Sequence, residues 1–280
     1  MMISLITVHD DLCTSCGMCS DVCPSGALTM KDSFPYARHP SACIYCGHCV
    51  AVCPEDALQH IGEKKGEFIL KTPDSNNPVD FFATRRSIRR YTSQPIASDI
   101  LQQLISIAET APSRHNARKR QYHIVKTQYA IEKLEKITAN HYRRLLNISP
   151  LILGFLSVVS PRKAKKMAKT FQGLKRLVAA ADKGHNPFYR GVPCVIFLTA
   201  PKKQYTGKDD CLAAQQILML RAHQLGLGTC SIGFALRAHK ALEKYLNIPK
   251  NRQIYAVTIV GYPKYHYKKA IYRPVEKCIF

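Results

Sequence analysis

The sequence predicts a two-domain chain of the α+β class, in which a small cysteine-rich domain precedes a larger domain of mixed helices and strands. The run CTSCGMCSDVCPSGAL, from Cys13, recurs as CIYCGHCVAVCPEDAL, from Cys43, which indicates a duplicated unit. About 200 residues remain beyond this repeat, enough for one further well-cored domain. Across that remainder, helical and strand-like patterns alternate, which predicts an α+β or α/β core.

Each copy of the repeat reads CxxCxxCxxxCP, a spacing that suits a cubic 4Fe-4S cluster. The two-residue gaps let one tight loop direct three thiolates at three irons, and the fourth cysteine of each run binds the other cluster. We therefore expect two clusters, one bound by Cys13, Cys16, Cys19 and Cys53 and the other by Cys43, Cys46, Cys49 and Cys23.

Zinc and disulfides are the alternatives for these cysteines. Zinc prefers paired CxxC knuckles separated by a longer loop, and disulfides need an oxidising compartment. Neither explains eight cysteines in two identical runs. Residues 1–62 thus resemble a bacterial-type two-cluster ferredoxin, pseudo-symmetric by duplication.

The charge balance is strongly basic: 41 Lys and Arg minus 19 Asp and Glu gives +22. Such a surface favours an acidic redox partner, for which we expect a ferredoxin or flavodoxin donor, over nucleic acid. The N-terminus lacks the basic leading segment of a signal peptide, and the apolar stretch LILGFLSVV at 151–159 is too short to span a membrane. Because cluster thiolates must stay reduced, a cytoplasmic protein is expected.

Residues 63–78 read as a linker, since Gly, Pro, Ser and Asn accumulate there, with FILK as a short strand. Beyond the linker, the periodicity predicts helices over 97–110, 129–147, 160–186 and 211–228, the last ending at Gly226 or Gly228. It predicts strands over 121–126, 194–200 and 254–262. The helix after Ser160 has one apolar stripe and an opposite face rich in Lys and Arg, which is typical of an ordinary surface helix. It could also shape a substrate pocket, bind an acidic donor or, as a third choice, lie on a membrane surface.

The stretch ATRRSIRRYT, residues 83–92, offers a dense set of cationic donors suited to a phosphate. By itself it reads as a solvated basic face. Together with APSRHN (111–116), HNPFYRGVPCVIFLTA (185–200) and GLGTCSIGF (226–234), it makes residues 79–280 resemble the nitroreductase family of FMN flavoproteins. The resemblance implies a mixed sheet wrapped by helices in an intertwined homodimer, with FMN at the subunit interface.

Carried over by position, the resemblance implies three sets of FMN-binding residues. The first set holds the phosphate and ribityl chain, and its members come from the beginning of this domain and from a position near its end. A second set reaches the flavin from the opposite subunit, and a third lies along the flavin ring. These sets are Arg85, Arg86, Ser87, Arg89 and Arg273; Pro112, Ser113 and Asn116; and Ser231, Ile232 and Gly233. The chain departs from the family pattern at Arg118, Lys119 and Arg120, and at Ile271, where a lysine is common.

The two halves together predict an enzyme in which clusters pass single electrons to FMN, and reduced FMN delivers a hydride to an electron-poor small molecule such as a nitroaromatic, quinone or activated alkene. No side chain is identified as a catalytic acid. NAD(P)H stays open as a donor, although no GxGxxG fingerprint is present. The alternative is an iron–sulfur redox sensor or nucleic-acid-binding protein that uses the basic surface.

Overall fold

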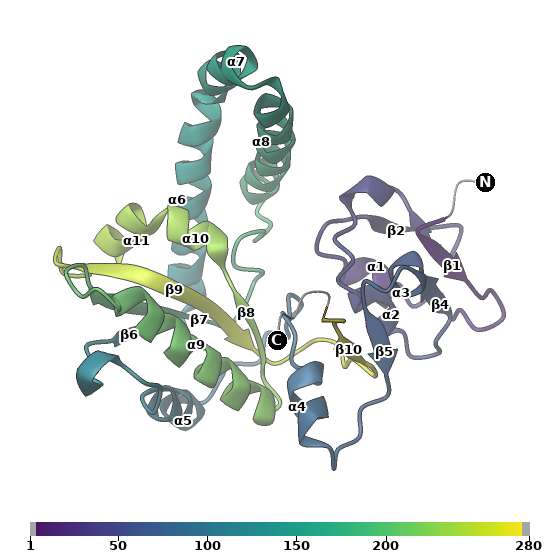
Figure 1. Cartoon of the computed structure of the whole chain (residues 1–280), viewed down its shortest axis with the longest axis horizontal. Helices are drawn as coiled ribbons and strands as arrows, with labels where there is room; N and C mark the ends of the chain where they lie inside the picture. The colour runs from purple at the N-terminus through teal and green to yellow at the C-terminus, as the bar shows by residue number, and fades with distance from the viewer. Residues whose placement is uncertain (1–3, 276–280) are drawn as a thin grey trace. The chain divides into compact units, whose positions relative to one another are not determined.

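The computed structural model describes residues 4–275 and divides them into two compact units. One unit contains the chain up to Arg90 together with the segment that begins at Pro263, and the other runs from Tyr91 to Tyr262. This grouping by compactness differs from the predicted domains 1–62 and 79–280, which follow family resemblance and stay a prediction. Figure 1 labels the elements of both units.

The first unit carries the duplication in its backbone. Short helices α1 (Met18–Asp21) and α2 (His48–Val52) each begin after a glycine with positive φ, Gly17 at 71° and Gly47 at 73°. The strand pairs are β1 (Ile6–Val8) with β4 (Leu58–His60) and β2 (Leu28–Lys31) with β3 (Phe34–Ala37), both antiparallel. Since β2 and β4 are thirty residues apart, as are the two cysteine runs, the two halves repeat one fold.

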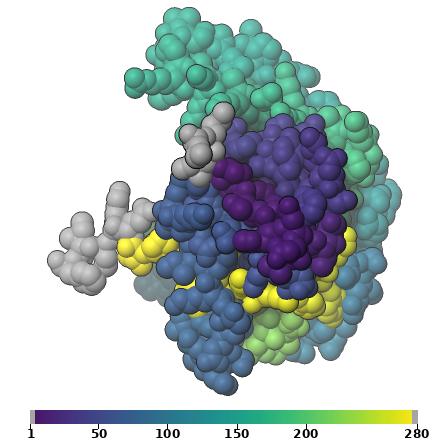
Figure 2. All heavy atoms as spheres, turned by 90° about the vertical axis from the view of Figure 1, so that its right-hand side faces the viewer, coloured from purple at the N-terminus to yellow at the C-terminus, as the bar shows by residue number. Residues whose placement is uncertain are grey.

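The end of the chain belongs to this first unit. After η1 (Pro40–Ala42) and α3 (Ile61–Lys64), strand β5 (Ile69–Lys71) pairs antiparallel with β10 (Ala270–Tyr272). Helix α4 (Pro78–Thr84) is capped by Asn77, whose side chain accepts a hydrogen bond from Val79 N. In Figure 2, the yellow C-terminal segment lies against blue residues of the same unit.

The second unit is built on a four-stranded antiparallel sheet in the order β6-β7-β9-β8. Its strands are β6 (Gln121–Val125), β7 (Cys194–Pro201), β8 (Gly228–Ser231) and β9 (Arg252–Gly261). Successive residues of β7 alternate between two apolar cores: Val195 and Phe197 pack into one, and Ile196 and Leu198 into the other. The sheet is therefore buried on both faces, which agrees with the expected covering by helices. The expected mixed sheet is not found among the described residues, because all three strand pairs of this sheet are antiparallel.

Helices cover both faces of this sheet (Figure 1). One core contains residues of α5 (Ser98–Ala108) and α9 (Gly207–Gln224), and the other contains residues of α6 (Gln128–Asn147), α8 (Pro161–Asp182), α10 (Gly233–Arg237) and α11 (His239–Tyr245). The predicted helix over 211–228 begins earlier, at Gly207, and ends earlier, because Gly226 takes a φ of 75° that closes the helix.

A buried carboxylate fixes the entry to the central strand. Glu135 on α6 is 4% exposed and accepts hydrogen bonds from Phe188 N at 3.0 Å and Tyr189 N at 2.9 Å. Tyr189 in turn lies 3.1 Å, hydroxyl to hydroxyl, from Thr138 on the same helix. Burial raises the pKa of Glu135, and the two backbone donors oppose that rise. These contacts hold the segment HNPFYRGVP against α6.

The apolar stretch 151–159, which carried no helix prediction, lies in α7 (Ser149–Val159). Several of its large side chains are exposed, among them Leu151 at 78%, Phe155 at 70% and Val158 at 85%. None of the described helices is by itself long and apolar enough to cross a membrane, whereas α6 and α7, bent by 49°, satisfy that criterion as a pair by length and composition.

Candidate functional site

The first set of predicted cluster ligands surrounds one cavity. Cys13, Cys16, Cys19 and Cys53 all line it, together with Met30 and Glu55 among others. Burial, followed by the neighbouring thiols of Cys16, Cys53 and Cys13, raises the pKa of Cys19 to about 12. A thiolate at this position therefore needs a compensating cation, which iron supplies. The residues fit a cluster.

The second set gathers in the same way. Burial, followed by the neighbouring thiols of Cys46 and Cys23, raises the pKa of both Cys43 and Cys49. Cys19 of the first set adds to the rise at Cys49. Backbone N–H groups face the sulfurs at both sites: Tyr45 N lies 3.4 Å from Cys43 Sγ, and Ala57 N lies 3.3 Å from Cys53 Sγ.

Among residues 4–275, no group of three or more His, Cys, Asp or Glu side chains is arranged to hold a metal ion. A cluster has a different requirement, because each thiolate binds a different iron of the cube. Four sulfurs around a cavity can meet that requirement without converging on one point. The ligand sets Cys13, Cys16, Cys19, Cys53 and Cys43, Cys46, Cys49, Cys23 stay predictions supported by this grouping.

His60 is a neighbour of the second site that the sequence interpretation missed. It is 2% exposed at the end of β4, and its Nε2 lies 3.4 Å from Cys43 Sγ. Its other ring nitrogen, Nδ1, accepts a hydrogen bond from Gly62 N at 2.8 Å. His60 lies seventeen residues from Cys43, so cysteine spacing could not reveal it; only the pairing of β4 brings it there.

The arginines assigned to FMN phosphate differ in their environments. Arg86 is 8% exposed, and its guanidinium carbon lies 4.3 Å from the centre of the Tyr267 ring. Its Nη2 donates to Lys269 O at 2.5 Å, while its Nη1 is buried without a hydrogen-bond partner among the described residues. Burial lowers the pKa of Arg86 to about 10. A buried cationic donor without a partner fits an anionic group such as a phosphate.

The other members of this group are less buried. Arg85, Ser87 and Arg89 are each partly exposed, and Arg89 Nη1 donates to Ser87 O at 3.2 Å. Arg273 is engaged elsewhere: its Nη1 donates to Tyr45 O and Glu67 O, both at 3.0 Å. Tyr45 lies within the second cysteine run and Glu67 lies just before β5, so Arg273 ties the C-terminal segment to that region.

The predicted cross-subunit segment lies on a loop with unusual backbone conformations. His115 and Asn116 have φ values of 51° and 52°, and Arg118 has 46°. Three non-glycine residues in the left-handed region store strain that the surrounding structure must compensate. Ser113 Oγ accepts from Arg118 N at 3.1 Å, and Asn116 Oδ1 accepts from Arg118 Nε at 2.9 Å.

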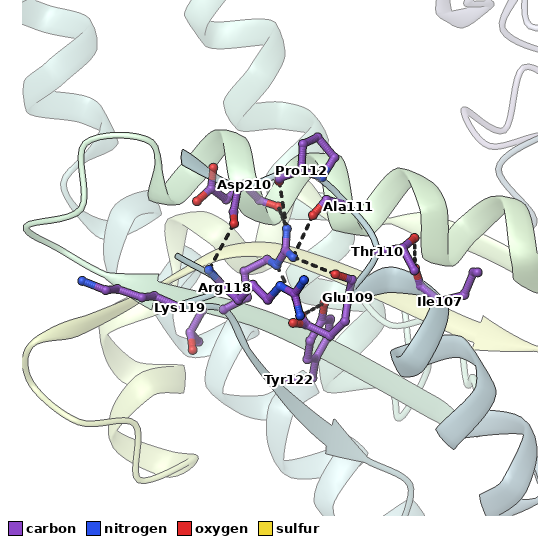
Figure 3. Close-up of polar contacts among 12 residues, drawn as sticks. Ile107, Glu109, Thr110, Ala111, Pro112, Arg118, Lys119, Tyr122 and Asp210 are labelled. Atoms are coloured by element: carbon purple, nitrogen blue, oxygen red, sulfur yellow. Dashed lines mark hydrogen bonds and ion pairs between the residues drawn. The ribbon is translucent and has the colours of Figure 1, made fainter. Parts of the chain in front are cut away.

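A buried arginine holds this loop in place. The side chain of Arg120 is 0% exposed and forms an ion pair with Glu109 at 3.3 Å. Its Nη atoms donate to the carbonyl oxygens of Ala111 at 3.0 Å, Pro112 at 3.1 Å and Asp210 at 3.2 Å. Figure 3 shows Glu109, Ala111, Pro112 and Asp210 around this guanidinium. The Nη atoms of Arg120 thus donate all of these hydrogen bonds to backbone carbonyl oxygens. This gives a structural reason for an arginine at position 120, where the chain departs from the family pattern.

The predicted flavin-ring loop, Ser231 to Gly233, joins the end of β8 to the start of α10. Ser231 pairs with Thr258, and Ile232 N donates to Val257 O at 2.9 Å, so the loop backbone is fixed to the central strand β9. Ser231 and Gly233 are exposed, and a Cβ built on Gly233 would meet nothing within 4 Å. The backbone at Gly233 is thus open to close approach by a planar ligand.

A larger cavity adjoins this loop. It has a volume of about 550 Å³, within the usual range for a small-molecule site. Its walls come from α6, α8 and α10, and they are mainly apolar and aromatic, with one cation: Tyr142, Leu145, Met167, Thr170, Phe171, Leu174, Gly233, Phe234 and Arg237. No ion pair of Arg237 is found in the described part of the chain.

The predicted FMN residues fall into both compact units. Arg85, Arg86, Ser87, Arg89 and Arg273 belong to the unit with the cluster cysteines, and Pro112, Ser113, Asn116, Ser231, Ile232 and Gly233 belong to the unit with the sheet. Within the second unit, Pro112, Ser113 and Asn116 lie in the segment after α5, where Asn116 ends the short 3-10 helix η2 (Arg114–Asn116). Ser231, Ile232 and Gly233 run from the last residue of β8 to the first residue of α10.

Comparison with known proteins agrees with both units. Residues 82–262 match the nitroreductase family model, and residues 12–57 match a 4Fe-4S dicluster domain. A 4-nitrobenzoate reductase of Pseudomonas putida is 26% identical over 193 residues, which cover 64% of this chain and 82% of that protein.

Solved structures show the same fold. A nitroreductase with bound FMN from Bacteroides fragilis aligns with a TM-score of 0.55 and 19% identity, covering 74% of this chain and 100% of that one. An FMN-dependent nitroreductase from Clostridium difficile aligns with a TM-score of 0.53 and 18% identity over the same shares of the two chains. The expected α+β fold and the fusion of a ferredoxin-type domain to an oxidoreductase domain are confirmed. The chain therefore belongs to the nitroreductase family and carries a 4Fe-4S dicluster domain ahead of the nitroreductase domain.

Proposed function

We propose that this chain is an FMN-dependent oxidoreductase that takes electrons from an acidic ferredoxin or flavodoxin and reduces an electron-poor small molecule. When bound, the two clusters supply single electrons and FMN supplies a hydride to the acceptor. The observation that carries the proposal is that predicted FMN-binding arginines share one compact unit with the cluster cysteines. In that unit, the buried Nη1 of Arg86 has no acceptor among the described residues, and a phosphate oxygen would supply one.

The chain's own residues would act by binding and orientation. Arg85, Arg86 and Arg89 would hold the phosphate, with Ser87 beside them, and Arg273 is the further candidate near the C-terminus. The Ser231–Gly233 backbone would lie along the flavin ring, and Pro112, Ser113 and Asn116 would approach it from the partner subunit. No side chain is assigned as the proton donor, and water can fill that role.

The cavity at Gly233 is the candidate acceptor site. Its aromatic walls, Tyr142, Phe171 and Phe234, suit a planar ring, and Tyr142 is held by a hydrogen bond from its hydroxyl to Phe234 O at 3.0 Å. Arg237 would favour acceptors that carry a carboxylate or another anionic group. The relative named 4-nitrobenzoate reductase acts, by its name, on such a compound.

We also propose that the protein is a cytoplasmic homodimer. The exposed apolar side chains of α7, among them Leu151, Phe155 and Val158, form a surface that a second copy of this chain would cover. The expected result of sedimentation analysis is a dimer for the wild type and a monomer for Phe155→Lys.

The test is anaerobic mixing of the holoprotein with reduced flavodoxin or ferredoxin, while cluster bleaching and flavin absorbance are followed in the same sample. Bleaching of the clusters followed by that of FMN, with reoxidation on adding a nitroaromatic, supports the proposal. If the flavin stays oxidised while the clusters cycle, the enzyme proposal fails. Tight, salt-sensitive DNA or RNA binding that survives flavin removal would then favour the redox-sensor alternative.

A further inference from the structure

The internal duplication allows the two cluster sites to be compared residue by residue. Cys43 corresponds to Cys13 and His60 corresponds to Met30, because the halves are offset by thirty residues. Met30 lines the cavity of Cys13, Cys16, Cys19 and Cys53, as expected from the symmetry. One site thus has a histidine where the other has a thioether, which carries no N–H group.

The proton of His60 can be placed from its hydrogen bonds. Gly62 N donates to His60 Nδ1 at 2.8 Å, so the neutral ring carries its hydrogen on Nε2. That nitrogen lies 3.4 Å from Cys43 Sγ, within range for an N–H···S hydrogen bond. The ring is also held by an edge contact with Tyr45 and a tilted contact with Phe68, at centroid distances of 5.7 and 5.6 Å.

We propose that His60 donates a hydrogen bond to the thiolate of Cys43 and makes the second cluster, bound by Cys43, Cys46, Cys49 and Cys23, the stronger electron acceptor of the two. A hydrogen bond to a ligand sulfur stabilises the more negative, reduced state of a cluster. No equivalent donor exists at Met30, so the stabilisation acts on one cluster alone.

The nearby charges act in the same direction. Arg273 lies at the second site, with its Nη2 3.4 Å from Cys46 O. Arg86 interacts electrostatically with Cys46 and packs on Tyr267, whose ring lies 5.5 Å from that of His48 between the ligands Cys46 and Cys49. The first cavity is lined by Glu55, and the ammonium of Lys268 donates to Pro54 O beside the ligand Cys53, so one anion and one cation lie there. Cations stabilise added negative charge, so the two arginines at the second site, set against this balanced pair at the first, raise the second potential relative to the first.

This asymmetry gives electron transfer a direction. A reduced ferredoxin or flavodoxin gives up one electron, the first cluster takes it, and the second cluster then takes it from the first. The cations around the second cluster, Arg86 among them, are the ones assigned to FMN phosphate. The inference about His60 rests on the dicluster domain and does not require FMN.

The test is a potentiometric titration of the anaerobic holoprotein, followed by electron paramagnetic resonance of the reduced clusters. We expect two separate one-electron steps for the wild type. His60→Met, which gives the second site the residue of the first, should lower the higher potential and leave the lower one unchanged. The reciprocal Met30→His should raise the lower potential. Iron content measured on each variant confirms that both clusters are loaded.

Two results would overturn the proposal. One is a His60→Met protein whose higher potential is unchanged, or whose two potentials fall equally. The other, which decides the matter if His60→Met does not load its clusters, is a Met30→His protein whose lower potential does not rise. Because the readout is a potential rather than turnover, a failure of the enzyme proposal would leave this test intact.

Discussion

Replacing Arg120 by methionine is expected to destabilise the sheet unit strongly. The side chain is 0% exposed, pairs with Glu109 and satisfies the carbonyl oxygens of Ala111, Pro112 and Asp210. Methionine can fill part of the volume but donates no hydrogen bond. A buried carbonyl oxygen left without a donor costs about 1–3 kcal/mol. The ion pair adds little because the side chain of Glu109 is 34% exposed, so we expect the free energy of unfolding to fall by about 2–4 kcal/mol in total.

Urea unfolding of the FMN-loaded protein, followed by circular dichroism, measures this change. Arg118→Met is the matched control, since Arg118 is exposed two residues away and its Nε contacts only Asn116 Oδ1 among the described residues. An exposed contact of this kind is worth roughly 0.5 kcal/mol or less. FMN retained after gel filtration is a second readout, because Arg120 fixes the loop that carries Ser113 and Asn116.

The reasoning would be refuted if Arg120→Met unfolded within about 1 kcal/mol of Arg118→Met, since a stranded buried partner alone costs more than that. Retention of FMN at the wild-type level together with the expected destabilisation would contradict only the role of the loop in flavin binding. The two readouts therefore separate the structural role of Arg120 from the functional one.

Further changes test the other sites. Arg237→Gln should raise KM for carboxylate-bearing nitroaromatics by about tenfold, the effect of losing roughly 1.4 kcal/mol, and should leave neutral ones unchanged; steady-state rates with paired acceptors decide this. Cys16→Ser should leave only one cluster fully bound, which iron analysis and paramagnetic resonance would show, and two intact clusters would contradict the ligand assignment. His123 has a pKa lowered by burial and then by Arg252, and its Nε2 lies 3.2 Å from Thr199 Oγ1. The pKa of His123 in the folded state therefore lies below its unfolded value of about 6.5, so the unfolded state binds a proton more readily. The free energy of unfolding is unaffected by this group above about pH 6.5 and falls as the pH drops below it, by at most about 1.4 kcal/mol per pH unit. His123→Gln should reduce this slope in urea midpoints measured between pH 7 and pH 5, and an unchanged slope would contradict the role of His123.

The sequence alone determined the features that depend on local spacing. The cysteine runs predicted the cluster chemistry, because a loop with two-residue gaps has a fixed reach whatever surrounds it. Apolar periodicity located α5, α6 and the strands β6, β7 and β9 closely, since each element buries one or both of its faces. The helix α7 and the short strand β8 were missed, because an all-apolar run and a glycine-rich loop carry no clear period.

Only the tertiary structure decided how distant segments combine. The pairing of β10 with β5 places Arg273 on the carbonyls of the second cysteine region, whereas the family resemblance implied a phosphate contact for this residue. In the sequence Arg120 is one of three basic residues at which the chain departs from the family pattern, and only the fold shows that carbonyl oxygens surround it. His60 meets Cys43 because strand pairing, which depends on long-range burial and register, sets which side chain faces which ligand. A local pattern specifies the chemistry a segment can support, and the packing of remote segments specifies the charges and hydrogen bonds that tune it.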